Sequence, residues 1–185
     1  MAFIVVSGSV VSYAEAVDVK DKDQRLFEAN EINFVDVPDS PGSLNAYLED
    51  LLSKSTARIG QKIRASAQWR IYLGYTGIDY DVNNIPEFNP NRIITRKADF
   101  TDMCCYYALK EYILPKVADF GNPESPEVQK IQYYERKFAD LFEELLSMMD
   151  WYDSDGNGSV GDSERMLNYR LPRRTRGRRR VTSVR

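Results

Sequence analysis

The segment from Asp153 to Glu164 places acidic and amide side chains at alternating positions. It reads Asp-Ser-Asp-Gly-Asn-Gly-Ser-Val-Gly-Asp-Ser-Glu. Ca²⁺ binds about six to eight oxygen atoms at about 2.3–2.6 Å, and carboxylates, amides and backbone carbonyls supply them. We therefore expect a calcium site with side-chain oxygens from Asp153, Asp155 and Asn157. Ser159 would add its backbone carbonyl, and Glu164 would close the site with two oxygens.

This spacing matches the loop pattern of EF-hand calcium sites, with Gly158 at the sharp turn. The pattern also requires a helix that ends just before the loop, and one is predicted there. An alternative is a turn that never binds calcium, because Asp, Gly and Asn favour turns in general. Only one such loop is present, and residues 165–170 allow fewer than two helical turns before Pro172. Both interpretations stay open, and a bound calcium would act as a structural clip rather than as a sensor.

The C-terminal segment, residues 165–185, is strongly basic. It holds nine arginines and neither an acidic residue nor a lysine. The whole chain has 25 basic and 28 acidic residues, so removing these nine leaves 16 basic residues and a net charge of −12 for residues 1–164. A segment with so few apolar groups cannot form a core, and we expect it to be extended and disordered when free from about residue 171.

Arginine favours a partner-binding role for this arm, because its planar guanidinium makes paired contacts to carboxylates or phosphates. The acidic body of a neighbouring copy is one such surface. The alternatives are a solubilising tail and a nonspecific binder of nucleic acid. The expected partner-binding residues are Arg170, Arg173, Arg174, Arg176, Arg178, Arg179, Arg180 and Arg185.

The remaining composition argues against catalysis. The sequence has no histidine, which removes the commonest general base and every Ser-His or Cys-His mechanism. Its two cysteines, Cys104 and Cys105, are adjacent, a spacing that fits neither a strain-free disulfide nor a zinc site. We expect both to be buried and free, and we expect no enzymatic activity.

The hydrophobic pattern predicts a mainly α fold. Apolar residues recur every three or four positions in three long segments, at about 43–64, 92–114 and 126–149, which is typical of helices that share a core. Ser125 and Pro126 form a helix start signal. Shorter helices are predicted near 21–29 and 66–73, with a loop over 74–91.

The expected architecture is a small helical bundle between two extended arms. Residues 1–42 form an N-terminal arm and a short helix, with a possible β-hairpin around Ser7-Gly8-Ser9. Residues 43–150 form the bundle, and residues 151–185 hold the EF-hand-like loop and the basic arm. No apolar run approaches the ~20 residues that a membrane-spanning helix needs, and the N-terminus lacks the basic leader of a secretory signal.

The order of these parts resembles the head-to-tail connector (adaptor or neck) proteins of tailed bacteriophages. The stretches that carry the resemblance extend over most of the chain. They are Leu48-Glu49-Asp50-Leu51-Leu52, Trp69, Ala98-Asp99-Phe100-Thr101-Asp102, Tyr112-Ile113-Leu114-Pro115 and the long helix that ends near Trp151.

The resemblance implies a small helical bundle that assembles as a ring, usually of twelve copies, beneath the portal at the capsid vertex. It implies the portal protein and neighbouring tail or neck proteins as partners, with contact to packaged DNA. The chain would be made in the host cytoplasm and located in the neck of the virion. The alternatives are a calcium-binding interaction protein and a nonspecific nucleic-acid-binding protein.

Overall fold

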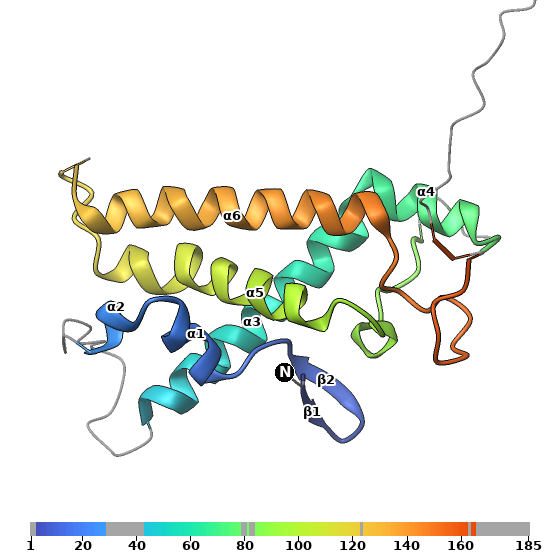
Figure 1. The fold of residues 1–185 in the computed structure, drawn as a ribbon, viewed down its shortest axis with the longest axis horizontal. Coiled ribbons are helices and arrows are strands. Elements are labelled where there is room, and N and C mark those ends of the chain that lie inside the picture. The colour runs from blue at the N-terminus through green and yellow to red at the C-terminus, as the bar shows by residue number, and fades with distance from the viewer. Residues whose placement is uncertain are drawn as a thin grey trace, which may run out of the picture.

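The chain folds as a set of helices with a small hairpin at one side, as Figure 1 shows. The structure is a computed structural model, and it describes residues 3–28, 43–78, 81, 84–122, 124–162 and 164–165. None of the described helices is long and apolar enough to cross a membrane. The predicted mainly α class is confirmed.

The N-terminal hairpin pairs strand β1 (Ile4–Val6) with strand β2 (Ser9–Ser12) in antiparallel fashion. Ser7 and Gly8 both have positive φ, 51° and 81°, as a tight two-residue hairpin turn of this hand requires. An isolated hairpin is only marginally stable. Here the Asn91 side chain braces it, because it accepts from the Val10 N–H at 2.8 Å and donates to the Gly8 carbonyl at 2.9 Å. The predicted hairpin is confirmed.

Four helices follow among the residues described in the first half of the chain. They are α1 (Ala16–Lys22), α2 (Gln24–Glu28), α3 (Ser43–Ala65) and α4 (Ala67–Tyr75). The Ser66 hydroxyl accepts from the Trp69 N–H at 3.1 Å and thereby starts α4. The helix expected near 21–29 is thus two helices with a break at Asp23, and the first of them begins earlier than predicted.

The second half holds α5 (Lys97–Ala108), a π-helical turn η2 (Leu109–Ile113), a 3₁₀ turn η3 (Leu114–Lys116) and α6 (Pro126–Met148). Pro115 explains the two irregular turns, because proline lacks an N–H and its ring crowds the carbonyl four residues earlier. As predicted, the Ser125 hydroxyl caps α6 by accepting from the Val128 N–H.

The prediction that the middle helix starts at residue 92 is wrong. The 3₁₀ turn η1 (Pro90–Arg92) precedes an extended stretch, and α5 begins only after Arg96, whose φ is +55°. In this stretch Ile93 forms an isolated antiparallel bridge with Tyr152, and the Ile94 N–H donates to the Trp151 carbonyl at 3.0 Å. These backbone contacts with residues distant in the sequence therefore favour an extended conformation of the two isoleucines over a helical one. β-branched residues adopt the extended conformation readily.

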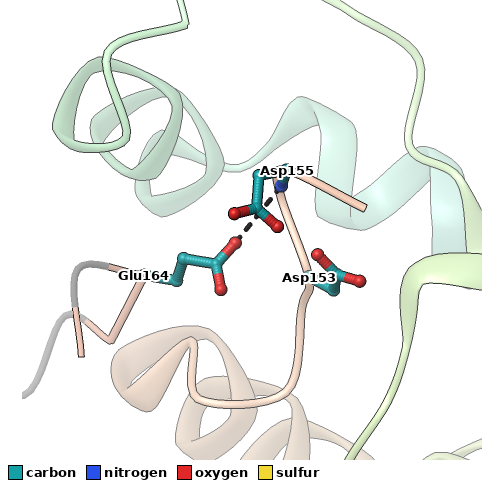
Figure 2. A group of neighbouring side chains, drawn as sticks. All are labelled: Asp153, Asp155 and Glu164. Atoms are coloured by element: carbon teal, nitrogen blue, oxygen red, sulfur yellow. Dashed lines mark hydrogen bonds between the residues drawn. The ribbon is translucent and has the colours of Figure 1, made fainter. Parts of the chain in front are cut away.

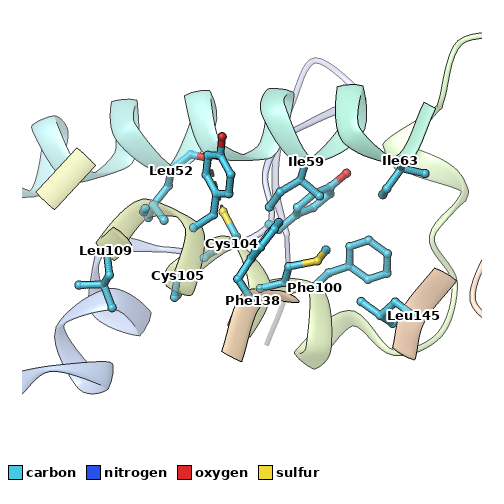
Figure 3. Close-up of a cluster of buried hydrophobic side chains, with 14 of the residues drawn as sticks. Leu52, Ile59, Ile63, Phe100, Cys104, Cys105, Leu109, Phe138 and Leu145 are labelled. Carbon is cyan, nitrogen blue, oxygen red and sulfur yellow. Dashed lines mark hydrogen bonds between the residues drawn. The ribbon is translucent and has the colours of Figure 1, made fainter. Parts of the chain in front are cut away.

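Helix α5 contacts both α3 and α6 and forms the centre of the core. Figure 3 shows side chains from these three helices meeting there. All of the following are buried: Leu52, Ile59 and Ile63 from α3, Phe100, Cys104 and Cys105 from α5, and Phe138 and Leu145 from α6. The apolar stripes of the three long segments thus share one core, as their periodicity predicts.

Both cysteines are buried and free, as expected. Burial raises the pKa of the Cys104 thiol to about 12 and raises that of Cys105 as well. The thiolate is the reactive form of cysteine, so neither side chain is a good nucleophile at neutral pH.

Phe100→Ala tests the importance of this core. The Phe100 ring is fully buried and lies 4.8 Å from Trp151 and 5.4 Å from Tyr13, between ring centroids. We expect the substitution to lower the free energy of unfolding by about 3–5 kcal/mol in chemical denaturation. Val17→Ala is the control, because Val17 is 59% exposed and should change the value by less than about 0.5 kcal/mol. Similar losses in both variants would contradict this assignment of the core.

Candidate metal centre

A short non-helical segment connects helix α6 to the loop. Helix α6 ends at Met148, and Met149 follows with a left-handed φ of 47°. The Trp151 side chain is fully buried, and its indole N–H donates to the Leu145 carbonyl at 2.7 Å. Residues 149–152 therefore separate the helix from Asp153. The helix predicted to end just before the loop is confirmed, because α6 ends within one residue of the predicted position, near residue 149.

Asp153 organises the first half of the loop. It is only 3% exposed, and its carboxylate accepts backbone N–H groups of Gly156 at 2.6 Å, Asn157 at 3.2 Å and Gly158 at 2.8 Å. Burial alone would raise the pKa of Asp153, but the hydrogen bonds from Gly158 and Gly156 outweigh it and hold this pKa below its usual range. Asp153 is therefore a carboxylate at neutral pH.

Glu164 closes the loop from its other end. Oε1 accepts the Ser154 N–H and hydroxyl, both at 2.6 Å, and the Asp155 N–H at 3.3 Å, while Oε2 accepts the Gly161 N–H at 2.9 Å. Figure 2 shows the bond from Asp155. Burial opposes ionisation here too, but the bonds from Ser154 and Gly161 hold the pKa of Glu164 below its usual range.

The three carboxylates are brought together as the sequence predicts. Oxygen atoms of Asp153, Asp155 and Glu164 all lie within 4.8 Å of one another. Two oxygens on opposite sides of one Ca²⁺ lie about 4.6–5.2 Å apart, twice the bond length. These separations are compatible with one ion between the three carboxylates, and calcium prefers oxygen ligands of this kind.

Asn157 and Ser159 are oriented differently from the expected ligands. The Asn157 Oδ1 atom accepts the Ser159 N–H at 2.8 Å and its hydroxyl at 2.7 Å. The Asn157 amide nitrogen instead faces the carboxylates and donates to Asp155 at 2.8 Å. Coordination by Asn157 would require rotating this amide, at the expense of both Ser159 bonds. The Ser159 carbonyl as a ligand stays a prediction. Gly158 has φ +85°, as the expected sharp turn requires.

Residues far away in the sequence brace the loop. The Arg92 guanidinium donates to the Ser154 carbonyl, and the Arg92 carbonyl accepts the Asp153 N–H at 2.9 Å. The Tyr72 hydroxyl donates to the Tyr152 carbonyl at 3.0 Å. Sequence reasoning missed Arg92 and Tyr72, because neither lies near the motif and no local pattern marks them.

The arginine arm lies almost entirely outside the described residues. Arg165 is described, and its guanidinium lies 3.6 Å from the Asp162 carboxylate on a fully exposed side chain. All of the predicted partner-binding residues lie outside the described part of the chain: Arg170, Arg173, Arg174, Arg176, Arg178, Arg179, Arg180 and Arg185.

No family model, curated protein or solved structure matches this chain. The sequence and the contacts of the described residues are therefore the basis for the function proposed for it.

The lowered pKa values of Asp153 and Glu164 predict an acid-sensitive loop. A carboxyl group with a depressed pKa in the folded state stabilises that state above the unfolded pKa of about 4, and this contribution is lost as the pH falls through the lower folded value. We expect the free energy of unfolding of the Asp153→Asn, Glu164→Gln variant to depend less on pH than that of the unmodified protein between pH 6 and 3. Chemical denaturation across this range measures both slopes.

Asp162→Asn is the matched control, because the Asp162 side chain is fully exposed and its removal should leave the slope unchanged. Equal slopes for the double variant and the unmodified protein would show that the two buried carboxylates do not stabilise the loop.

Proposed function

We propose that this protein is a non-enzymatic structural component of a tailed-bacteriophage virion, a head-to-tail connector that joins the portal to the tail. In this role the helical body forms a ring with other copies, and the arginine-rich arm docks on the portal or on an adjoining subunit. The protein would act by occupying a defined place between two larger assemblies, so that no chemical step is required of it.

The observation that carries the proposal is the division of charge along the chain. Residues 1–164 have a net charge of −12, whereas residues 165–185 hold nine arginines and no acid. A highly basic segment is attracted to the acidic body of a neighbouring copy and to other acidic partners. Electrostatic complementarity of this kind selects the partner and fixes the register of the contact. This distribution of charge favours a role in assembly over a role in catalysis.

The mainly helical fold agrees with the resemblance described above. Connector proteins of this kind look like small helical bundles with extended termini, and here α3, α5 and α6 share one core with a hairpin beside it. The fold supports the proposal only in this general sense, because many unrelated proteins are small helical bundles.

Purified phage particles test the connector role. We expect the chain to co-migrate with particles in a density gradient, at about one copy per portal subunit by mass spectrometry. A variant with Arg173, Arg174, Arg178 and Arg179 changed to Glu should be absent from the particles and keep its circular dichroism spectrum, because the sequence predicts that so basic a segment contributes nothing to the core. Recovery of the unmodified chain only in the soluble fraction, or normal attachment of the variant, would count against the role.

We further propose that the 153–164 loop binds Ca²⁺ as a structural clip at the base of the arm. The observation in favour is the approach of three carboxylates to within 4.8 Å of one another. The hydrogen bonds that these oxygens already accept hold them in place before the ion arrives, and Trp151 and Arg92 fix the loop to the body. Calcium binding would therefore stiffen the point from which the arm leaves, without opening a groove.

Calorimetry and thermal melting test the clip. A ligand that binds only the folded state stabilises it by about 2.7 kcal/mol at a hundredfold excess over its Kd. We expect binding heat and a rise in Tm with calcium, and loss of both in Asp153→Ala. The fully exposed Asp162 supplies the control, since Asp162→Ala should keep both responses. If the unmodified protein shows neither binding heat nor a Tm change in excess calcium, the proposed clip is wrong and the segment is a turn that does not bind calcium.

A further inference from the structure

A basic groove lies between α3 and the π turn after α5. Its volume is about 500 Å³, and its lining includes Arg58 and Lys62 from α3 and Tyr107, Glu111 and Tyr112 from the opposite side. Arg58 and Lys62 are both exposed and four residues apart, so that they lie on the same helix face about one turn apart. The part of the chain that carries this groove is acidic as a whole, so two neighbouring cations are unexpected there and indicate a local preference for anions.

The two groove cations have no acidic partner in the described part of the chain. The Arg58 guanidinium donates to the Gln61 side-chain oxygen at 3.1 Å, and the Lys62 Nζ atom lies 5.8 Å from the centre of the Tyr107 ring. No described carboxylate lies within 4.0 Å of either cation. By contrast, the neighbouring Lys110 is paired with Glu111 at 2.6 Å. Arg58 and Lys62 therefore keep their charge available for an outside anion.

The Tyr107 ring of the groove is too buried to stack on a nucleic-acid base. Proteins that bind single-stranded nucleic acid stack bases on exposed aromatic rings. Tyr107 is only 6% exposed, and the Nζ atoms of Lys62 and Lys110 lie 5.8 and 5.2 Å from the centre of its ring. A base therefore has no free face of Tyr107 to stack on, whereas a carboxylate can contact the exposed cations directly.

The second half of α6 carries acids that have no cation of their own. Asp140 and Glu143 are exposed, and no cation among the described residues lies within 4.0 Å of either carboxylate. The adjacent Glu144 pairs with Arg96. One turn earlier, Lys137 lies over the Tyr133 ring, 5.7 Å from its centre, rather than against Asp140. Asp140 and Glu143 together form an exposed acidic patch.

We propose that the basic groove of one copy, Arg58 and Lys62, receives the acidic patch of a second copy, Asp140 and Glu143. Each pair lies on one helix face with a spacing of three or four residues, so the two helices can match charge to charge. The two surfaces are different parts of the molecule, and the contact is therefore head-to-tail, a geometry that closes into a ring or continues as an open filament. The inference deepens the proposed connector role by naming the contact between ring subunits.

Charge reversal in purified protein tests the contact. The groove variant is Arg58→Glu with Lys62→Glu, and the patch variant is Asp140→Lys with Glu143→Lys. All four side chains are exposed, so that both variants should keep the unmodified Tm and circular dichroism spectrum. We expect the unmodified chain to self-associate in light scattering at low salt, and each variant alone to associate at least about tenfold more weakly, because like charges then face each other.

Mixing the two variants is the decisive step. In the mixture each contact again joins opposite charges, since the reversed groove meets the reversed patch and the original groove meets the original patch. Assembly of the mixture but of neither variant alone would establish the pairing. Assembly of the single variants like the unmodified protein, or a mixture that stays dissociated, would refute it, as would an unmodified chain that remains monomeric at all concentrations.

Two controls separate the contact from other sources of association. Asp162→Lys reverses a fully exposed acid outside the patch and should leave assembly unchanged. Deletion of residues 171–185 tests the arm, and assembly that disappears with the arm but survives both charge reversals would overturn the groove model. None of these measurements uses phage particles. If the chain assembles in this pattern but is absent from particles, the connector role is wrong and the contact between copies still stands.

Discussion

The burial of Trp151 is the interaction on which the rest of the structure depends. Its ring packs edge-on against Phe100 from α5 at 4.8 Å, and its indole N–H donates to the Leu145 carbonyl near the end of α6. The Trp151 carbonyl in turn accepts the Ile94 N–H. Through its side chain and its carbonyl, Trp151 thus connects the end of α6, the start of α5 and the beginning of the 153–164 loop. A large aromatic group buried with its polar atom satisfied contributes strongly to a core, so these three segments keep their relative positions.

The 153–164 loop combines features of a cation site with those of a turn that satisfies its own backbone N–H groups. The carboxylates of Asp153 and Glu164 accept hydrogen bonds from backbone N–H groups, which lowers both pKa values and gathers negative charge in a small volume. The same arrangement caps the turn and prepares a cation site, because hydrogen bonds to the ionised form favour it in either case. Asn157 distinguishes the two states, since its oxygen faces Ser159 here and would have to rotate to face an ion.

Much of the fold could be predicted because the long helices are amphipathic and their start signals are local. The apolar stripe of α6 and the Ser125 cap are examples in which periodicity and a nearby hydrogen bond decide the outcome. The start of α5 could not be predicted in this way. Ile93 and Ile94 continue an apolar pattern that suits a helix, but they lie extended because a bridge to Tyr152 satisfies their backbone. A partner that is distant in sequence leaves no mark on local periodicity.

The sequence by itself determined the helical class, the acidic body with its arginine-rich arm, and the three carboxylates that converge in the loop, because each depends on residue type and short spacing. Only the tertiary structure decided how the loop is entered and which residues brace it. The Trp151 indole donates to the Leu145 carbonyl near the end of α6, and the Arg92 guanidinium donates to the Ser154 carbonyl of the loop. It also decided that Arg58 and Lys62 have no acidic partner among the described residues, while Lys110 is paired with Glu111. The physical reason is that such contacts join segments far apart in the chain, and their energies appear only once packing has brought those segments together.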